Sequence, residues 1–406
     1  MHIAYFTNFY LPVVNGVVRS VQSFREALSA LGHNVFVFAQ EDNYEDTEPF
    51  IFRYPSLHLP LAVDIPTALP VSPFMDQLIP KLKLDIIHTH HPVLLGQTAA
   101  TKARDLNIPL VFTFHTQYQE YTHYFPFPQE QVQEFLKSTV MNWMREYMRK
   151  CQHIVIPSES MRSILVNDYG LVDKFTVIPT GIDLTPYKKA NGEAVRSQWN
   201  WPDDKVIISA GRLAEEKNWV TLLRAFAIAQ KKQPNLRLVL LGDGPQADAL
   251  RQLVGELEIT DRVTFAGKVP FEEVPNYLKA ADLFSFASIT ETQGLVTLEA
   301  MASGLPVVAV DASGTKDILE DGKQGFLVEN DPEALANGIV NLVENSSLTG
   351  KFKTAALRTA RAYDNNRLAR KMLKVYERAI IDKKNEQYVT VQDPAAAIPI
   401  PEKVSA

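Results

Sequence analysis

Short, continuous apolar runs alternate with helix-length segments along most of the 406 residues. A run of Val, Ile and Phe without polar alternation is typical of a parallel strand that is covered on both faces. Parallel neighbours need a crossover, which a helix usually provides. In the first half, strands are expected at residues 2–6, 34–39, 85–90, 109–115, 153–158 and 175–179, and helices at 16–31 and 129–150. The pattern predicts βαβ units in a doubly wound sheet.

The same alternation begins again after a polar, proline-containing interval. Further strands are expected at residues 206–211, 237–242, 263–267, 283–288 and 306–310. We therefore predict an α/β protein with two Rossmann-like, doubly wound domains, residues 1–185 and 205–363, joined by a linker at 186–204. Ligands of such folds bind at the carboxyl ends of the strands, so a binding cleft is expected between the two sheets.

The C-terminal end of the chain has a different character. A charged, amphipathic helix is expected at residues 364–385, and we expect it to return to the N-terminal domain. Residues 386–406 contain several prolines and no periodic apolar pattern. A disordered tail is therefore expected there.

Composition excludes some classes of protein. The net charge is −6, whereas proteins that bind nucleic acid, or that are held on membranes by polybasic patches, have surfaces rich in Lys and Arg. No nucleic-acid partner is expected. The single cysteine, Cys151, favours a reducing compartment. The sequence has neither a signal peptide nor an apolar run of about 20 residues, so a cytoplasmic location is expected.

Two cations follow the first strand of the second half. Gly211 and Arg212 stand where this strand turns toward a helix, and Lys217 comes five residues after Arg212. Glycine lets the backbone approach a ligand, and cations beside a helix N-terminus suit a diphosphate. An ordinary solvated turn with two surface charges is the alternative. Residues 242–245 form a second glycine-rich turn at the end of the next strand.

Two carboxylates flank a third turn. Glu291 precedes a helix that stops at Gly304, and Glu299 lies about two turns into this helix. Glu299 has apolar neighbours, among which an unpaired charge is costly, so the hydroxyl groups of a ribose are suitable partners. The alternative is a glutamate that caps a helix or pairs within its own domain.

Together these motifs resemble the retaining glycosyltransferases of family four, which have the GT-B fold. The resemblance covers the chain up to its tail. It rests on Gly211-Arg212 with Lys217, on residues 242–245 and 265–267, and on Glu291-x7-Glu299 followed by Ala-Met-Ala-x-Gly-x-Pro. In the first half, residues 10–12, 15–18, 88–92 and 112–118 are most similar to bacterial glucosyltransferases that act on diacylglycerol.

The resemblance implies roles for individual residues. Arg212 and Lys217 would bind the donor diphosphate and stabilise the leaving group. Glu291 would hold sugar hydroxyls, Glu299 the ribose, and His115 the transferred sugar. The catalytic residues would be His115, Arg212, Lys217 and Glu291. The other donor-binding residues would be Asn15, Gly16, Gly211, Gly242, Gly267, Val269, Gly294 and Leu295, the last two through their backbone amides.

Some positions allow more than one interpretation. All nine histidines precede residue 154. His88, His90 and His91 lack companion cysteines or acidic residues, so a buried or cleft-lining role is favoured over a metal site. Asn15-Gly16 fits both an ordinary β-to-α turn and a loop whose amides reach the donor phosphates.

Two positions depart from the family pattern. Thr292-Gln293-Gly294 stands where many members have Gly-Phe-Gly, which leaves the identity of the donor sugar open. Thr180 replaces the usual Asn in Pro179-Thr180-Gly181, at the entry to the linker. A structural hinge and a direct ligand contact are both compatible with this segment.

Two stretches could attach the N-terminal domain to the inner face of a membrane. Residues 57–80 are rich in proline and apolar side chains. Residues 135–151 mix Trp143 and three methionines with basic side chains, as interfacial helices do. The alternative for the second stretch is that its apolar stripe packs on the sheet.

We therefore expect a retaining hexosyltransferase that moves glucose from UDP-glucose to an acceptor hydroxyl. The resemblance implies diacylglycerol or another membrane lipid as the acceptor. No cofactor and no metal is expected, because Arg212, Lys217 and helix N-termini can neutralise the leaving diphosphate. The open alternatives are transfer to a soluble sugar or polysaccharide, a sugar-nucleotide epimerase of the same fold, and an inactive nucleotide-sugar sensor.

Overall fold

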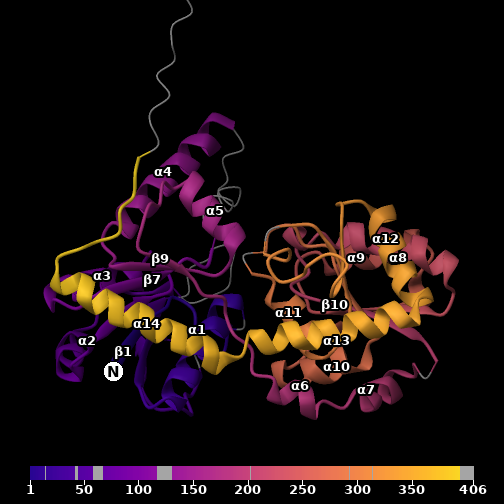
Figure 1. Ribbon diagram of the computed structural model, residues 1–406, viewed down its shortest axis with the longest axis horizontal. Coiled ribbons are helices and arrows are strands. Elements are labelled where there is room, and N and C mark those ends of the chain that lie inside the picture. Colours follow the sequence, from indigo (N-terminus) through magenta and orange to yellow (C-terminus); the bar gives the residue numbers. More distant parts are fainter. Residues whose placement is uncertain are drawn as a thin grey trace, which may run out of the picture.

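The computed structural model describes residues 1–13, 15–41, 44–57, 67–116, 130–201, 203–291, 293–312 and 314–393. Figure 1 shows two lobes, each built on a parallel sheet. This arrangement confirms the expected α/β class with two Rossmann-like domains.

The first domain contains a seven-stranded sheet with the order β3-β2-β1-β6-β7-β8-β9. Its strands are β1 (His2–Phe6), β2 (Asn34–Gln40), β3 (Ile51–Tyr54), β6 (Ile86–Thr89), β7 (Leu110–Thr113), β8 (His153–Ile156) and β9 (Phe175–Val177). Its helices are α1 (Gly16–Ala30), α2 (Pro73–Leu78), α3 (Leu95–Asp105), α4 (Glu130–Met148) and α5 (Glu159–Asn167). A small antiparallel pair, β4 (Ser56–Leu57) and β5 (Thr67–Ala68), lies outside this sheet.

The second domain contains a six-stranded sheet with the order β12-β11-β10-β13-β14-β15. Its strands are β10 (Lys205–Ala210), β11 (Leu236–Leu241), β12 (Val263–Gly267), β13 (Leu283–Phe286), β14 (Val307–Val310) and β15 (Gly325–Val328). The helices from this part of the chain onward are α6 (Thr185–Lys189), α7 (Gly192–Trp199), α8 (Trp219–Lys232), α9 (Ala247–Glu256), α10 (Val274–Ala280), α11 (Leu295–Ala302), α12 (Pro332–Glu344), α13 (Ser346–Ala362) and α14 (Asn365–Lys384).

The first strand shows why the apolar runs are continuous. Ile3 and Tyr5 of β1 pack into a core that they share with α1 and α14 on one face of the sheet. Ala4 and Phe6 pack into a second core with α3, α4 and α5. Strand β10 is likewise covered on both faces. Neither strand has a solvent-facing side, so polar alternation is absent.

Strand order reverses at one point in each sheet. In the first sheet this point lies between β1 and β6, and in the second between β10 and β13. Loops that leave neighbouring strands at such a point run in opposite directions, which opens a ligand-binding crevice at the carboxyl edge. The sequence motifs around Arg212 and Glu291 follow β10 and β13 respectively, so they flank the reversal in the second sheet.

The chain passes between the domains at two places that lie side by side. The first crossing follows β9, and the second joins α13 to α14. Ile182 N donates to Tyr363 O at 2.9 Å, which pairs the two crossings. A Cβ atom on Gly181 would lie 2.9 Å from Asn365 Cα, so the close approach of the two backbones requires glycine. Helix α14 then lies along the first domain, end to end with α13 (Figure 1).

Part of the expected C-terminal tail is ordered, which corrects the expectation of disorder for residues 386–393. Val389 and Val391 are buried in the core of the first domain. Val389 N donates to Cys151 O at 2.9 Å, and Gln392 N donates to Gly170 O at 2.8 Å. The prolines that suggested disorder begin at residue 394, and residues 394–406 lie outside the described part.

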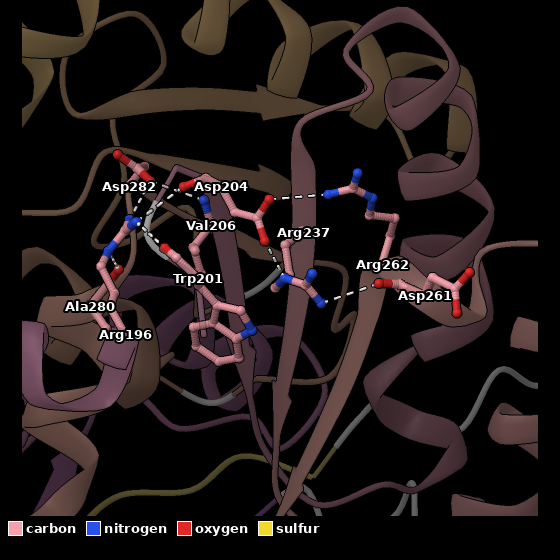
Figure 2. Close-up of polar contacts among 9 residues, drawn as sticks. All are labelled: Arg196, Trp201, Asp204, Val206, Arg237, Asp261, Arg262, Ala280 and Asp282. Atoms are coloured by element: carbon pink, nitrogen blue, oxygen red, sulfur yellow. Dashed lines mark hydrogen bonds and ion pairs between the residues drawn. The ribbon is translucent and has the colours of Figure 1, made fainter. Parts of the chain in front are cut away.

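Residues 186–204, expected as a linker, contain helix α7 and are anchored to the second domain. Figure 2 shows the guanidinium of Arg196, on α7, at the centre of this anchor. It donates to Ala280 O and to Asp282 Oδ2, both at 2.7 Å, and also to Trp201 O and Asp204 O. The carboxylate of Asp204 accepts from Arg237 and Arg262. These contacts fix the segment to the second domain.

Helix α4 divides into two parts. Met144, Tyr147 and Met148, in its C-terminal half, are buried in the core of the first domain. Its N-terminal half projects away from the domain (Figure 1), and Phe135 there is 69% exposed. None of the described helices combines the length and apolar character needed to cross a membrane.

Candidate functional site

In the second domain, glycines stand at the carboxyl ends of three adjacent strands, β10, β11 and β12, and backbone hydrogen bonds join these strand ends to one another. Gly211 N, just after β10, donates to Leu241 O at 2.9 Å, and Gly242 N donates to Gly267 O at 2.9 Å. Gly242 has a φ of +134°, and a Cβ atom there would lie 1.9 Å from Gly211 O. Only glycine fits this position. Gly267 has open space where a side chain would project.

The turn after β10 carries the two expected cations. Trp219 Nε1 donates to Arg212 O at 2.9 Å, which holds the turn against helix α8. The side chain of Arg212 is exposed and makes no ion pair within the part of the chain that the structure describes. Lys217, at the end of a short 3-10 helix (Glu215–Lys217), forms an ion pair with Glu291.

Glu291 is held by its neighbours in the loop after β13. Ser288 Oγ donates to Glu291 Oε1 at 2.8 Å, on the same carboxylate that binds Lys217. Gly314 packs against the Glu291 backbone so closely that a Cβ atom would lie 2.4 Å from Glu291 O. The structure therefore brings Lys217 and Glu291 together.

Helix α11 begins without a side-chain cap. Gly294 stands at its N-cap with a φ of +74° and offers no side-chain acceptor to the first amides. A Cβ atom on Gly16, in the first domain, would lie 4.0 Å from Leu295 Cδ1, so the starts of α1 and α11 face each other across the domain boundary. Asn15 has a local role, because its side chain caps α1 by accepting from Val18 N at 2.9 Å.

Glu299 pairs with the other domain. Its side chain is 4% exposed and forms an ion pair with Arg19 of α1. The guanidinium carbon of Arg19 also lies 4.3 Å from the ring centre of Phe271, in the second domain. The alternative of a partner within Glu299's own domain is therefore wrong. Sequence analysis missed Arg19, although its position three residues after Gly16 was a usable signal.

His115 follows β7 and is partly exposed. Its Nε2 lies 2.9 Å from His90 Nδ1, and the two rings stack with centroids 5.2 Å apart. His90 Nε2 is buried and makes no hydrogen bond in the described part of the chain. An unpaired buried N–H costs more than an unpaired lone pair, so we assign the proton of His90 to Nδ1. His90 then donates to His115 Nε2, and His115 carries its own proton on Nδ1.

The remaining histidines of this group have separate partners. His88 bonds Tyr376 Oη and Thr113 Oγ1, each at 2.7 Å, and His91 Nδ1 accepts from Asn8 N at 3.0 Å. These contacts give the buried role that sequence analysis favoured. No group of three or more His, Cys, Asp or Glu side chains suited to a metal ion is found among the described residues.

Val269 is half-buried and packs against the core beside helix α10. Its neighbour Lys268 is exposed. Contact of this segment with a nucleotide base stays a prediction, as do the ligand-binding roles of the other site residues.

Burial lowers the pKa of several histidines in the first domain. The pKa of His115 falls to about 3 by desolvation, and that of His91 to about 3 by desolvation and by the charge of His115. The pKa values of His88 and His90 also lie well below the ordinary value for the same reasons. These side chains are therefore neutral at pH 7.

This burial predicts a pH-dependent stability. A histidine with a lowered folded-state pKa remains neutral as the pH falls below about 6.5, while the unfolded chain takes up the proton. The unfolding free energy should therefore be highest above pH 7 and should fall between pH 6.5 and 5, by up to about 1.4 kcal/mol per pH unit for each such histidine. Urea unfolding followed by tryptophan fluorescence at pH 7.5, 6.0 and 5.0 measures the slope.

A matched variant checks the cause. The pKa of His153 is lowered to about 4, mainly by burial, and its Nε2 lies 2.9 Å from Thr176 Oγ1. His153→Gln retains a hydrogen-bonding group there but does not titrate, so its stability should decline less steeply below pH 6.5. Equal slopes for this variant and the wild type would contradict the explanation.

Comparison with known proteins agrees with the geometry. Residues 14–186 match the family model described as Glycosyltransferase Family 4, and residues 192–359 match Glycosyl transferases group 1. The chain is 35% identical to the alpha-monoglucosyldiacylglycerol synthase of Streptococcus pneumoniae R6 over 337 residues, which are 80% of this chain and 75% of that protein. It is 31% identical to the synthase of the same name from Acholeplasma laidlawii over 408 residues, or 95% of this chain and 99% of that one.

Solved structures agree on the fold. Anabaena HepE in complex with UDP-glucose superposes with a TM-score of 0.73 at 20% identity, over 93% of this chain and 99% of that chain. The motifs, the two Rossmann-like domains and these relatives give the same assignment. The chain belongs to the family-four glycosyltransferases of the GT-B fold, and it is an enzyme that transfers a hexose.

Proposed function

We propose that this enzyme transfers glucose from UDP-glucose to diacylglycerol with retention of the anomeric configuration. The observation that carries the proposal is the convergence of Arg212, Lys217, Glu291 and the start of α11 where strand order reverses in the second sheet. Support for diacylglycerol as the acceptor comes from the names of the two synthase relatives, and support for UDP-glucose as the donor comes from the HepE complex.

The donor diphosphate is proposed to lie between Arg212 and the first turn of α11. Arg212 offers an exposed guanidinium, and Gly294 and Leu295 start a helix whose amides have no side-chain cap. A helix N-terminus and a guanidinium both favour a phosphate group. Lys217 supplies the second positive charge. It is paired with Glu291, and binding of the donor exchanges or shares that partner.

The sugar and the ribose are proposed to lie on either side of the diphosphate. Glu291, fixed by Ser288, accepts hydrogen bonds from the hydroxyls of the glucose. Glu299 accepts from the ribose hydroxyls, with Arg19 balancing its charge. His115 presents its Nδ1–H to the glucose, because His90 occupies its other nitrogen. Gly242 and Gly267 leave room for backbone contact, and the base lies against Val269.

The transfer step has a simple balance of atoms. The acceptor hydroxyl oxygen forms a bond to C1 of the glucose, and the bond from C1 to the β-phosphate oxygen breaks. The acceptor proton passes to the departing phosphate. Arg212 and Lys217 stabilise the negative charge that develops on the leaving UDP, which is the largest contribution such groups make. Glucose is α-linked in UDP-glucose, and the relatives' names specify an α-glucosyl product, which supports the proposed retention.

The projecting half of α4 is the proposed membrane contact. Phe135 is 69% exposed and Val132 37% exposed there, whereas Met144 and Tyr147 are buried in the core. An apolar face of this kind can enter the interface of a bilayer and bring the active site near a lipid acceptor. Of residues 57–80, the other stretch considered, positions 58–66 lie outside the described part.

The two cations give the first functional prediction. Arg212→Ala and Lys217→Ala should each lower kcat/KM for the donor by about 10²–10³-fold, because each removes a charge that stabilises the leaving diphosphate. Steady-state transfer assays at saturating acceptor measure the loss. Lys231→Ala, an exposed lysine at the end of α8, is the control and should behave as the wild type. Near-normal turnover of both site variants would remove the proposed diphosphate site.

Product analysis tests the reaction itself. Purified enzyme with UDP-glucose and vesicles that contain diacylglycerol should yield a monoglucosyl lipid by mass, with an α-anomeric coupling constant by proton NMR. Parallel reactions contain GDP-mannose, soluble sugar acceptors, or donor alone. Glucosylation of soluble sugars without any lipid product would refute the acceptor. An epimerised or hydrolysed donor without transfer would instead identify one of the alternative activities.

Membrane contact is tested separately. Phe135→Glu should weaken sedimentation with anionic phospholipid vesicles about tenfold, since a buried aromatic side chain contributes about 1.5–3 kcal/mol. The control is Ile381→Glu, which charges a comparably exposed apolar position, 51% exposed, on α14. If both variants sediment as the wild type does, α4 is not the contact.

A further inference from the structure

Gln293 makes an unusual pair of hydrogen bonds with the opposite side of the domain boundary. It lies in the loop after β13, two residues after Glu291 and one before Gly294. Its Oε1 accepts from Thr180 N at 2.6 Å, and its Nε2 donates to Thr180 O at 2.8 Å. Both residues are buried, with 4% and 5% exposure. The side-chain amide thus pairs with the Thr180 backbone as a neighbouring strand would.

Thr180 is a junction of three segments. It lies on the first crossing between the domains, two residues before Ile182, which pairs with the second crossing. Its hydroxyl donates to Ser20 Oγ of α1 at 2.9 Å. Gln293 therefore connects the loop of Glu291 both to the hinge and, through Thr180, to the helix that carries Arg19.

The two hydrogen bonds between Gln293 and Thr180 fix the position of one residue relative to the other. An amide can make both bonds to one residue in only one relative position and orientation. Loss of the side chain leaves a buried N–H and a buried C=O of Thr180 without partners, which is costly. The ion pair of Arg19 with Glu299, in contrast, joins long side chains that can follow a small displacement.

We propose that Gln293 is a positioning residue that fixes the loop of Glu291 and Gly294 against the interdomain crossing, in the arrangement that receives the donor. The proposal rests on the donor site proposed above. Without the hydrogen bonds between Gln293 and Thr180, this loop is in the donor-binding arrangement for a smaller fraction of the time. Apparent donor affinity falls in proportion to that fraction, while the chemical groups of the reaction remain in place.

The test compares two buried glutamines. Gln293→Met keeps length and apolar volume but removes both hydrogen bonds. Gln324 is equally buried, at 3% exposure, and also makes two bonds: Oε1 accepts from Glu320 N at 2.9 Å, and Nε2 donates to Thr359 Oγ1 at 2.8 Å. All its partners lie within the second domain. Gln324→Met therefore removes the same number of buried hydrogen bonds as Gln293→Met, but it leaves the contacts between the two domains intact.

We expect both variants to melt at lower temperature than the wild type. Only Gln293→Met should raise the KM for UDP-glucose, about tenfold, with a smaller change in kcat. If the variant does not fold, Gln293→Glu serves instead, because it keeps the acceptor for Thr180 N but cannot donate to Thr180 O. An equal effect of the two methionine variants on donor KM would overturn the proposal, and so would an unchanged KM in Gln293→Met.

A second measurement needs no substrate. Amide hydrogen exchange of the ligand-free protein should become faster over residues 178–184 in Gln293→Met, because Thr180 N loses its acceptor, and should not change there in Gln324→Met. Unchanged exchange in both variants would show that the hydrogen bond from Thr180 N to Gln293 does not protect this segment, and would overturn the proposal. If the wild type transfers no sugar from UDP-glucose, the donor assignment fails. The exchange experiment still decides whether Gln293 holds the crossing.

Discussion

Each domain depends on one strand that has a parallel partner on both sides at the point where strand order reverses, β1 in the first and β10 in the second. Such a strand is buried on both faces, so the helices of both layers are packed against it. The loops at its carboxyl end diverge from those of the next strand and leave backbone groups accessible. Arg212 and Glu291 follow β10 and β13, and His90 follows β6, beside β1. The position of the candidate site thus follows from the packing of the sheets.

Both carboxylates of the candidate site are paired with cations of the chain itself. Lys217 is paired with Glu291, and Glu299 with Arg19. A buried carboxylate without a partner would destabilise the fold, so the protein supplies an internal partner for each. A donor with a diphosphate and several hydroxyls can replace or share these partners without leaving a charge exposed to an apolar surround. In the proposed function, the same groups therefore serve both for pairing within the chain and for binding the donor.

Interior strands were predictable because their apolar pattern is unambiguous. Residues 34–39 correspond to β2, and 206–211 to β10. Two of the edge strands, β9 and β12, were also predicted, at residues 175–179 and 263–267. The other two were missed: β3 contains Arg53, and β15 begins at Gly325, so neither has a long apolar run. An edge strand has a neighbour on one side only and needs less apolar character. The helix at 365–384 was predictable from its periodicity, whereas the order in residues 386–393 depends on contacts with distant parts of the chain.

Local features of the site were also readable from the sequence. The glycine-rich turns and the spacing of the carboxylates predicted which loops lie together at the sheet edge. Pairings between distant residues were not predictable. Arg19 and Glu299 are 280 positions apart, and Thr180 and Gln293 are 113 apart. The two departures from the family pattern proved to be hydrogen-bonded to each other, which neither segment reveals alone.

The return of α14 to the first domain has a consequence for how the protein is made. Leu368, Met372 and Tyr376 complete one core of that domain, and Val389 and Val391 complete the other. Both cores of the second domain draw their buried residues from positions 182–360 alone. During synthesis the second domain can therefore acquire its whole interior first. The domain that leaves the ribosome first keeps apolar strands uncovered until α14 and residues 389–391 have been added.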